Sequence, residues 1–478
     1  MATAARTSQS LLPRIVRSIS SSRNKSTAAA AAAAGSLDAT DPILDLSDTE
    51  RLFGPAETGE LLRSLATMYT LAMEPAVDLG MAVLKSPSVM SSPAVMAAVR
   101  GTVYRQFCAG EGMEEAAETL RRLWKVGLRG ILDYGLEDAV DGEACDRNLA
   151  GFLRTVDMTP ALPASSVSFA CVKITAICPV NLLERISDLI RWQKKHPSFP
   201  LPWMRPSLPV LSVSSPLYHT LSTPPPLTAG EEAELHRSHA RLTALCTRCA
   251  NTDLPLLIDA EYTSVQPAID YITYSAALQF NAPKKKKPIV YGTIQSYLKD
   301  AKQRLVQAVD AAESAGISIG FKLVRGAYLS RETKLASSVG AASPIHDTIR
   351  ETHACYNDCA AFMLERTANG SAACLLATHN LESGKAAAAK AEEVGIGKGD
   401  ERLQFAQLMG MADGLSLGLR NAGFQVSKYL PFGPVEQVIP YLLRRAEENR
   451  GFLSTSTLDR DLIRKELKRR LSAAVQRK

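Results

Sequence analysis

Eight short apolar runs, separated by segments of helical composition, constrain the fold of this chain of 478 residues more than any other feature. Each run is rich in β-branched or other apolar residues, which is typical of strands buried on both faces. Eight such strands alternating with helices indicate an α/β protein, a distorted (βα)₈ barrel of the TIM type. The runs cover Leu128–Asp133, Ser168–Thr175, Pro255–Asp259, Pro288–Gln295, Ser318–Arg325, Ala373–His379, Leu403–Leu408 and Val426–Pro431.

Composition divides the rest of the chain into further regions. Residues 42–125 alternate short helical patterns with small loops, which predicts an N-terminal helical region in front of the barrel. We predict the barrel over residues 126–450, with a proline-rich insertion at 196–228 that cannot form a regular helix. Residues 451–478 combine apolar positions at helical spacing with many basic residues, which predicts a basic C-terminal helix. Such a helix could lie on anionic lipid, or pack on the barrel with a solvated outer face.

The N-terminus has the composition of an organelle-targeting leader. Residues 1–36 contain four arginines, one lysine and no acidic residue, and they are rich in serine and alanine. This composition predicts a disordered transit peptide, with an untargeted basic tail as the alternative. Without these five charges the formal net charge falls from +6 to +1. The remaining chain therefore shows no charge excess that would indicate a nucleic-acid partner.

The sequence gives no sign of a membrane span, a disulfide framework or a metal site. No uncharged apolar stretch reaches 18 residues, so we predict no transmembrane helix. The nine cysteines are odd in number and scattered through apolar stretches, which indicates reduced, buried thiols. His236, His239, Cys246 and Cys249 have the side chains of a zinc site. They fall in one helical pattern, however, where a rise of about 1.5 Å per residue puts His236 about 15 Å from Cys246.

A polar or charged residue stands near the C-terminal end of every predicted strand. In a (βα)₈ barrel these ends and the loops after them carry the functional side chains, so these residues should meet at one mouth. Strand ends are also polar simply because loops begin there, but that does not explain lysines embedded in apolar runs. The set comprises Asp133, Lys173, Asp259, Gln295, Lys322, Arg325, His379, Asn380, Gln407 and Tyr429.

The segment after the eighth run carries two adjacent arginines and a carboxylate one turn later. It reads PVEQVIPYLLRRAEEN, and on a helix Glu448 lies on the same face as Arg444 and Arg445. Guanidinium groups can hold a carboxylate in a bidentate manner, and a glutamate can face an ammonium group. The pattern therefore suits a small zwitterion, with an ordinary surface ion pair as the alternative.

Several motifs together resemble the proline dehydrogenase family, in its eukaryotic mitochondrial, plant-like form. They are LIDAE, KLVRGAY, ATHN, QLMGMAD and YLPFG followed by YLLRRAEEN, in this order within residues 125–450. The resemblance implies a distorted (βα)₈ barrel that binds FAD and oxidises L-proline to Δ1-pyrroline-5-carboxylate by hydride transfer to flavin N5, the first step of proline catabolism. It further implies a mitochondrial enzyme that passes electrons to a quinone and can associate peripherally with the inner membrane.

The resemblance also implies roles for individual residues around the substrate. Lys173, Arg444 and Arg445 would hold the carboxylate of proline, and Glu448 would complete the clamp. Glu137 falls where a carboxylate can pair with an arginine and shut the site. The substrate-binding set is Lys173, Asp259, Ala327, Tyr328, Leu408, Tyr429, Arg444, Arg445 and Glu448, and the catalytic set is Lys322, Asp259 and Tyr429.

The positions that the resemblance assigns to FAD contain one departure from the family pattern. Bacterial members read RLVKGAY where this chain reads KLVRGAY, so Lys322 takes the place next to flavin N5. Lysine and arginine differ in hydrogen-bond geometry, so either Lys322 or Arg325 could contact that atom. The cofactor set is Gln295, Lys322, Arg325, Gly326, Asp347, Thr348, Thr378, His379 and Asn380.

Two other functions are compatible with a barrel of this kind. One is a different flavin barrel that acts on hydroxyproline or reduces a folate. Tyr429 would crowd the ring carbon that bears the hydroxyl group, which favours unsubstituted proline. The other is a binding barrel without activity, which is disfavoured because burying unused cations is costly.

Overall fold

The computed structural model describes the chain from Ile43 to Gln476, with a few internal gaps. The predicted leader, residues 1–36, therefore lies outside the described residues. The gaps are residues 212, 221, 282, 284–286 and 452, and the side chains at 87, 220, 448–451 and 453–456 are not described either.

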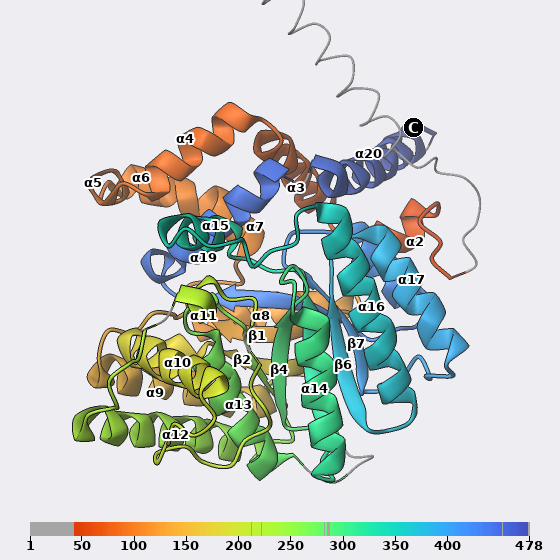
Figure 1. Ribbon diagram of the computed structural model, residues 1–478. Coiled ribbons are helices and arrows are strands. Elements are labelled where there is room, and N and C mark those ends of the chain that lie inside the picture. The colour runs from red at the N-terminus through yellow and green to blue at the C-terminus, as the bar shows by residue number, and fades with distance from the viewer. Residues whose placement is uncertain are drawn as a thin grey trace, which may run out of the picture. The chain divides into compact units, whose positions relative to one another are not determined.

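The eight strands form a closed, all-parallel barrel in chain order, so the predicted fold class is confirmed (Figure 1). Strand β8 closes the barrel against β1, where Ile131 lies opposite Tyr429 and Leu132 opposite Leu430. The strands are β1 (Arg129–Tyr134), β2 (Val167–Val172), β3 (Leu256–Ile258), β4 (Val290–Gln295), β5 (Ile319–Val324), β6 (Ala372–Ala377), β7 (Leu403–Leu408) and β8 (Val426–Phe432).

Apolar side chains fill the interior of the barrel. Phe169 and Tyr291 meet edge to face with ring centroids 4.9 Å apart, and Ile131 and Leu375 pack in the same cluster. This apolar plug makes the barrel a packed core rather than a pore. A ligand inside the barrel would therefore have to bind near the C-terminal ends of the strands, where the cavity lies.

Helices surround the barrel on the outside (Figure 1). The described residues of the predicted proline-rich insertion have no regular structure apart from one short helix, α11. Two 3₁₀ helices, Thr159–Ala161 and Ile174–Ala176, follow α9 and β2. The helices are α9 (Gly142–Met158), α10 (Val180–Lys195), α11 (Pro216–Thr220), α12 (Ala229–Asn251), α13 (Gln266–Phe280), α14 (Ala301–Ser314), α15 (Leu329–Ser338), α16 (Ile349–Ala368), α17 (Leu381–Glu393) and α18 (Asp413–Asn421).

The expected free thiols are present, and the four possible zinc ligands share one helix. All nine cysteines are free, and all except the partly exposed Cys355 are buried. His236 and Cys246 lie on the single helix α12. Within the described residues, no three metal-ligating side chains come close enough to hold an ion.

The N-terminal region is helical, and it packs against the helix that follows β8. That helix, α19 (Val435–Gly451), contacts α4 and a π-helix at Arg100–Tyr104. The other helices of the region are α2 (Thr49–Phe53), α3 (Thr58–Leu71), α4 (Glu74–Leu84), α5 (Pro87–Met90), α6 (Pro93–Val99), α7 (Arg105–Phe107) and α8 (Met113–Lys125).

The C-terminal helix α20 (Leu453–Gln476) packs against α2, α3 and α18. Its residues Leu462 and Ile463 are each only 1% exposed, so they belong to the core and not to a lipid-facing surface. Near its end, Leu471 and Val475 are exposed. Of the two alternatives for this segment, packing on the rest of the protein holds for Leu462 and Ile463. None of the helices in the described part of the chain is long and apolar enough to span a bilayer.

Candidate active site

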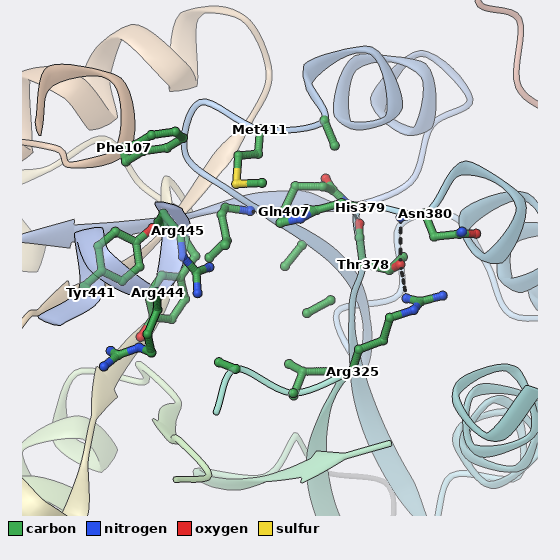
Figure 2. Close-up of a pocket in the computed structure, with 18 of the residues that line it drawn as sticks. Phe107, Arg325, Thr378, His379, Asn380, Gln407, Met411, Tyr441, Arg444 and Arg445 are labelled. Carbon is green, nitrogen blue, oxygen red and sulfur yellow. Dashed lines mark hydrogen bonds between the residues drawn. The ribbon is translucent and has the colours of Figure 1, made fainter. Parts of the chain in front are cut away.

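A cavity lies at the C-terminal ends of the strands, where the sequence predicts the functional mouth. Residues of α3 and α7, among them Met68 and Phe107, and the arginines of α19 complete its wall (Figure 2). The cavity brings together most of the residues assigned from sequence: Lys173, Asp259, Gln295, Lys322, Arg325, Gly326, Ala327, Tyr328, Thr378, His379, Asn380, Leu408, Tyr429, Arg444 and Arg445.

Three assigned residues are not placed on this wall. Asp347 is an exposed residue whose Oδ1 lies 3.0 Å from Lys299 Nζ, and Thr348 caps α16 by accepting a hydrogen bond from the amide of Glu351. The backbone of Glu448 belongs to α19, but its side chain lies outside the described part of the structure.

Five buried residues from different strands form what we call the carboxylate cluster: Asp133, Lys173, Asp259, Lys322 and Tyr429. Asp259 is at its centre, with Oδ1 bonded by Lys322 Nζ and Oδ2 accepting a 2.7 Å hydrogen bond from the Tyr429 hydroxyl. Lys173 Nζ lies 3.7 Å from Asp259 Oδ2 and 3.3 Å from Asp133 Oδ2. Each carboxylate of the cluster therefore faces at least one ammonium group.

The charges of this cluster stabilise one another in a buried setting. Burial alone would raise the pKa of Asp259, but the Lys322 and Lys173 ammonium groups outweigh it and lower the pKa to about 2. Burial alone would lower the pKa of Lys173, and the carboxylates of Asp133 and Asp259 instead hold it well above the usual range. Burial also keeps the pKa of Tyr429 well above that of an ordinary phenol, so its hydroxyl remains a donor.

The two arginines of α19 have different surroundings. Arg444 makes a bidentate ion pair with Glu137, with distances of 2.7 and 2.9 Å, so the carboxylate–arginine pair expected from sequence is present. Its guanidinium also lies 5.2 Å from the centre of the Tyr328 ring. Arg445 is 5% exposed and lies over the Tyr441 ring. In Figure 2 the Arg445 side chain reaches toward the centre of the cavity, whereas Arg444 turns toward its edge.

Arg325 is the centre of a second group, the Arg325 cluster, formed with His353, Thr378, Asn380 and Ser383. Its guanidinium donates to Thr378 Oγ1 at 2.6 Å (Figure 2). It also donates to Ser383 Oγ at 2.8 Å and to His353 Nδ1 at 2.9 Å. These acceptors are neutral, and in the described part of the chain no carboxylate bonds Arg325. Burial lowers the pKa of Arg325 from its ordinary value, in keeping with a charge that no anion offsets.

His379 and Gly326 complete this side of the cavity. His379 Nε2 accepts a hydrogen bond from the amide of Leu408 at 3.1 Å, so that nitrogen carries no proton. Burial and the nearby Arg445 and Lys428 lower the pKa of His379 to about 3. Gly326 has φ +144°, and a Cβ there would lie 2.5 Å from the Tyr297 ring, so only glycine fits.

The residues on this side fit an anionic cofactor such as FAD. A half-buried guanidinium that bonds neutral groups and, among the described residues, no carboxylate can accept a negative charge without first losing an ion pair. Gly326 also lines the cavity, and its lack of a side chain lets the Tyr297 ring pack against this part of the wall. The carboxylate cluster, by contrast, already balances its own charges.

Sequence reasoning missed several residues at the site. Glu261 is 1% exposed and accepts hydrogen bonds from the Thr175 amide at 3.2 Å and hydroxyl at 2.7 Å, and burial raises its pKa to about 8. Its position in LIDAE, two residues after Asp259, was a usable signal. Met68, Phe107 and Asp459, unlike Glu261, line the cavity itself. They come from helices before and after the barrel, α3, α7 and α20, and no local pattern marks them.

Comparison with known proteins gives one consistent result. A family model described as proline dehydrogenase matches residues 116–457. Proline dehydrogenase 2, mitochondrial, of Arabidopsis thaliana is 54% identical over 90% of this chain and 91% of its own length. Hydroxyproline dehydrogenase of Homo sapiens is 34% identical over 88% of this chain and 92% of its own length.

Solved structures show the same fold at much lower identity. Proline utilization A (PutA) from Bdellovibrio bacteriovorus, inactivated by N-propargylglycine, is 18% identical with a TM-score of 0.62. The match covers 87% of this chain, which spans only 44% of that longer protein.

Proposed function

The chain belongs to the proline dehydrogenase family, and from that premise we propose that it oxidises L-proline to Δ1-pyrroline-5-carboxylate with FAD as the hydride acceptor. As a proline dehydrogenase it is an oxidoreductase of the first step of proline catabolism. One observation carries the finer proposal. Lys173, Arg444 and Arg445 line the same cavity as Tyr429, whose hydroxyl is bonded to Asp259 at 2.7 Å.

These residues suit a small ring that bears a carboxylate. Arg445 and Lys173 would bind the carboxylate of proline, with Arg444 beside them and Glu448 completing the clamp. The ring would pack on Tyr429, which Asp259 holds in place, while Ala327, Tyr328 and Leu408 supply the remaining wall. Arg444 would exclude water through its pair with Glu137 at the edge of the cavity.

FAD, when bound, supplies an acceptor for the hydride that leaves the carbon next to the ring nitrogen. Lys322 would place positive charge near the reacting edge of the cofactor, where it stabilises developing negative charge. The substrate amine must be neutral to react. The residues proposed to hold the cofactor are Gln295, Lys322, Arg325, Gly326, Thr378, His379 and Asn380, with Asp347 and Thr348 at its adenylate half.

We also propose a mitochondrial location and a quinone as the electron acceptor. The leader at residues 1–36 has the composition of a transit peptide, and both Arabidopsis thaliana relatives are named as mitochondrial. Peripheral association with the inner membrane would bring the enzyme to a membrane quinone. A fluorescent protein fused behind residues 1–36 should enter mitochondria, and a cytosolic signal would contradict this location.

The test of the activity is anaerobic reduction of the purified flavoprotein. L-Proline should bleach the flavin absorbance, and trans-4-hydroxy-L-proline should not, because the Tyr429 ring, which lines the cavity, would crowd the substituted ring carbon. The similarity to hydroxyproline dehydrogenases makes this comparison necessary. Faster bleaching by the hydroxylated compound would overturn the proposed substrate, and a protein without bound flavin would overturn the cofactor.

A further inference from the structure

Helix α18 begins at a residue that cannot cap it. Its N-cap is Ala412, in the left-handed conformation with φ 50°, and a methyl group accepts no hydrogen bond. The acceptors come instead from the C-terminal helix. Asp459 of α20 receives hydrogen bonds from the amides of Asp413 and Gly414, both at 2.9 Å. A carboxylate at this position also interacts favourably with the positive end of the helix dipole.

The contact between the two helices is close enough to require a glycine. A Cβ at Gly414 would lie 2.5 Å from Leu462 Cδ1 and 3.0 Å from Asp459 Oδ1. Leu462 and Asp459 are 1% and 3% exposed, so α20 is seated directly on the first turn of α18. This contact is part of the core and not a loose surface association.

The loop that leads into α18 forms part of the cavity wall. Gly410, Met411 and Ala412 line the cavity together with Asp459 itself, and Met411 is seen there in Figure 2. Two other elements hold the same loop. Lys428 of β8 donates to the carbonyl of Met411 at 2.8 Å, and the side-chain amide of Gln106 donates to the carbonyl of Gly410 at 3.0 Å.

We propose that Asp459 is a positioning residue of the active site, which fixes the β7–α18 loop and so places Leu408 and Met411 against the substrate. It acts through the backbone of the loop and performs no chemistry itself. The matched family segment ends at residue 457, so this residue lies beyond the part of the chain that the family model describes. The identity of the substrate, although not the contact, rests on the proposed function.

Amide hydrogen exchange of the full-length flavoprotein tests the contact without any substrate. Asp459→Ala removes both acceptors, so exchange in a peptide that contains residues 409–418 should accelerate about fivefold or more, as for the loss of a helix cap. Asp459→Asn retains one acceptor and should give a smaller increase. Asp461→Ala removes a half-exposed carboxylate from the same helix and is the matched control. Unchanged exchange in Asp459→Ala would overturn the proposal.

Steady-state kinetics then separate positioning from general stability. Asp459→Ala should raise KM for L-proline roughly tenfold with a smaller change in kcat, because the wall is displaced and the reacting groups remain. Asp459→Asn should recover part of this loss. Gly414→Ala should reproduce the KM defect by pushing Leu462 away with the carboxylate intact. A fall in melting temperature with unchanged KM in all three variants would show a purely structural role and contradict the proposal. If the wild type failed to oxidise proline, the exchange experiment would still show whether Asp459 holds the start of α18.

Discussion

The two clusters that line the cavity handle buried charge in opposite ways. In the carboxylate cluster, Lys173 and Lys322 each face a carboxylate, and the charges balance within the protein. In the Arg325 cluster, the guanidinium bonds hydroxyl and imidazole groups, and no carboxylate of the described residues bonds it. The first cluster can hold a substrate in place without needing a further charge. The second retains a positive charge for which a bound anion is the natural partner.

The largest expected effect comes from breaking the balance of the carboxylate cluster. Asp259→Asn leaves the Lys322 ammonium buried without its anion, which should lower the free energy of unfolding by about 3 kcal/mol. Urea denaturation of the purified protein at pH 7 measures this loss. Adding Lys322→Met to the variant removes the stranded charge and should restore part of the stability. If Asp259→Asn alone were as stable as the wild type, the charges of the cluster would not depend on one another.

The same kind of substitution in the Arg325 cluster should affect cofactor binding more than stability. Arg325→Met removes hydrogen bonds to neutral partners, so the free energy of unfolding of the apoprotein should fall by only about 1 kcal/mol. The ratio of flavin to protein after purification should fall severalfold. Arg366→Met, which breaks a 3.0 Å pair with Glu313 on the outer helices, is the control and should keep its flavin. Full flavin content in Arg325→Met would show that the Arg325 cluster does not bind the anionic cofactor.

The buried carboxyl group of Glu261, near Lys173, should make the stability of the protein depend on pH. Burial raises its pKa to about 8, so its stabilising contribution is complete below the unfolded value of about 4.5 and is lost as the pH rises toward 8. Glu261→Gln mimics the protonated group and removes this dependence. Its unfolding free energy relative to wild type should therefore increase by more than about 1 kcal/mol between pH 5 and pH 8. The fully exposed control Glu143→Gln should show no such change, and a pH-independent difference for Glu261→Gln would contradict the assignment.

The most confined change is the removal of one hydroxyl group, that of Tyr429. Tyr429→Phe keeps the ring but removes the 2.7 Å hydrogen bond to Asp259. A hydrogen bond to a charged group contributes about 1.5 kcal/mol, so kcat/KM for L-proline should fall roughly tenfold. Preference for proline over trans-4-hydroxy-L-proline should persist, because the ring still occupies the space. A large gain in activity on the hydroxylated compound would show that ring position depends on the hydroxyl.

The barrel was predictable because strands buried on both faces leave a strong pattern in the sequence. Charged residues inside apolar runs, such as Lys173 and Lys322, were equally informative, since the only inexpensive place for them is a shared mouth with partners. The arginine pair of α19 could be recognised from its spacing in the sequence. The contact of one of these arginines with Glu137 was expected from the family resemblance.

Other parts of the site left no local pattern. Asp459 reaches the cavity because α20 folds back onto α18, and Phe107 reaches it because the N-terminal helices pack on α19. Such contacts join different helices through tertiary packing, and no periodicity encodes them. The surroundings of Asp347 and Thr348 could not be inferred either, because their assignment followed the order of the family motifs and not a physical constraint.

The central claim is that the arginines of α19 bind the substrate carboxylate, and anaerobic titration of the bound flavin with L-proline tests it most directly. We expect Arg445→Met to weaken apparent proline affinity by roughly a hundredfold, the double variant with Arg444→Met to weaken it further, and flavin content to remain unchanged. Glu137→Gln should have a much smaller effect, because it removes the partner of Arg444 and not the carboxylate-binding groups. Tight proline binding retained in the double variant would contradict the account.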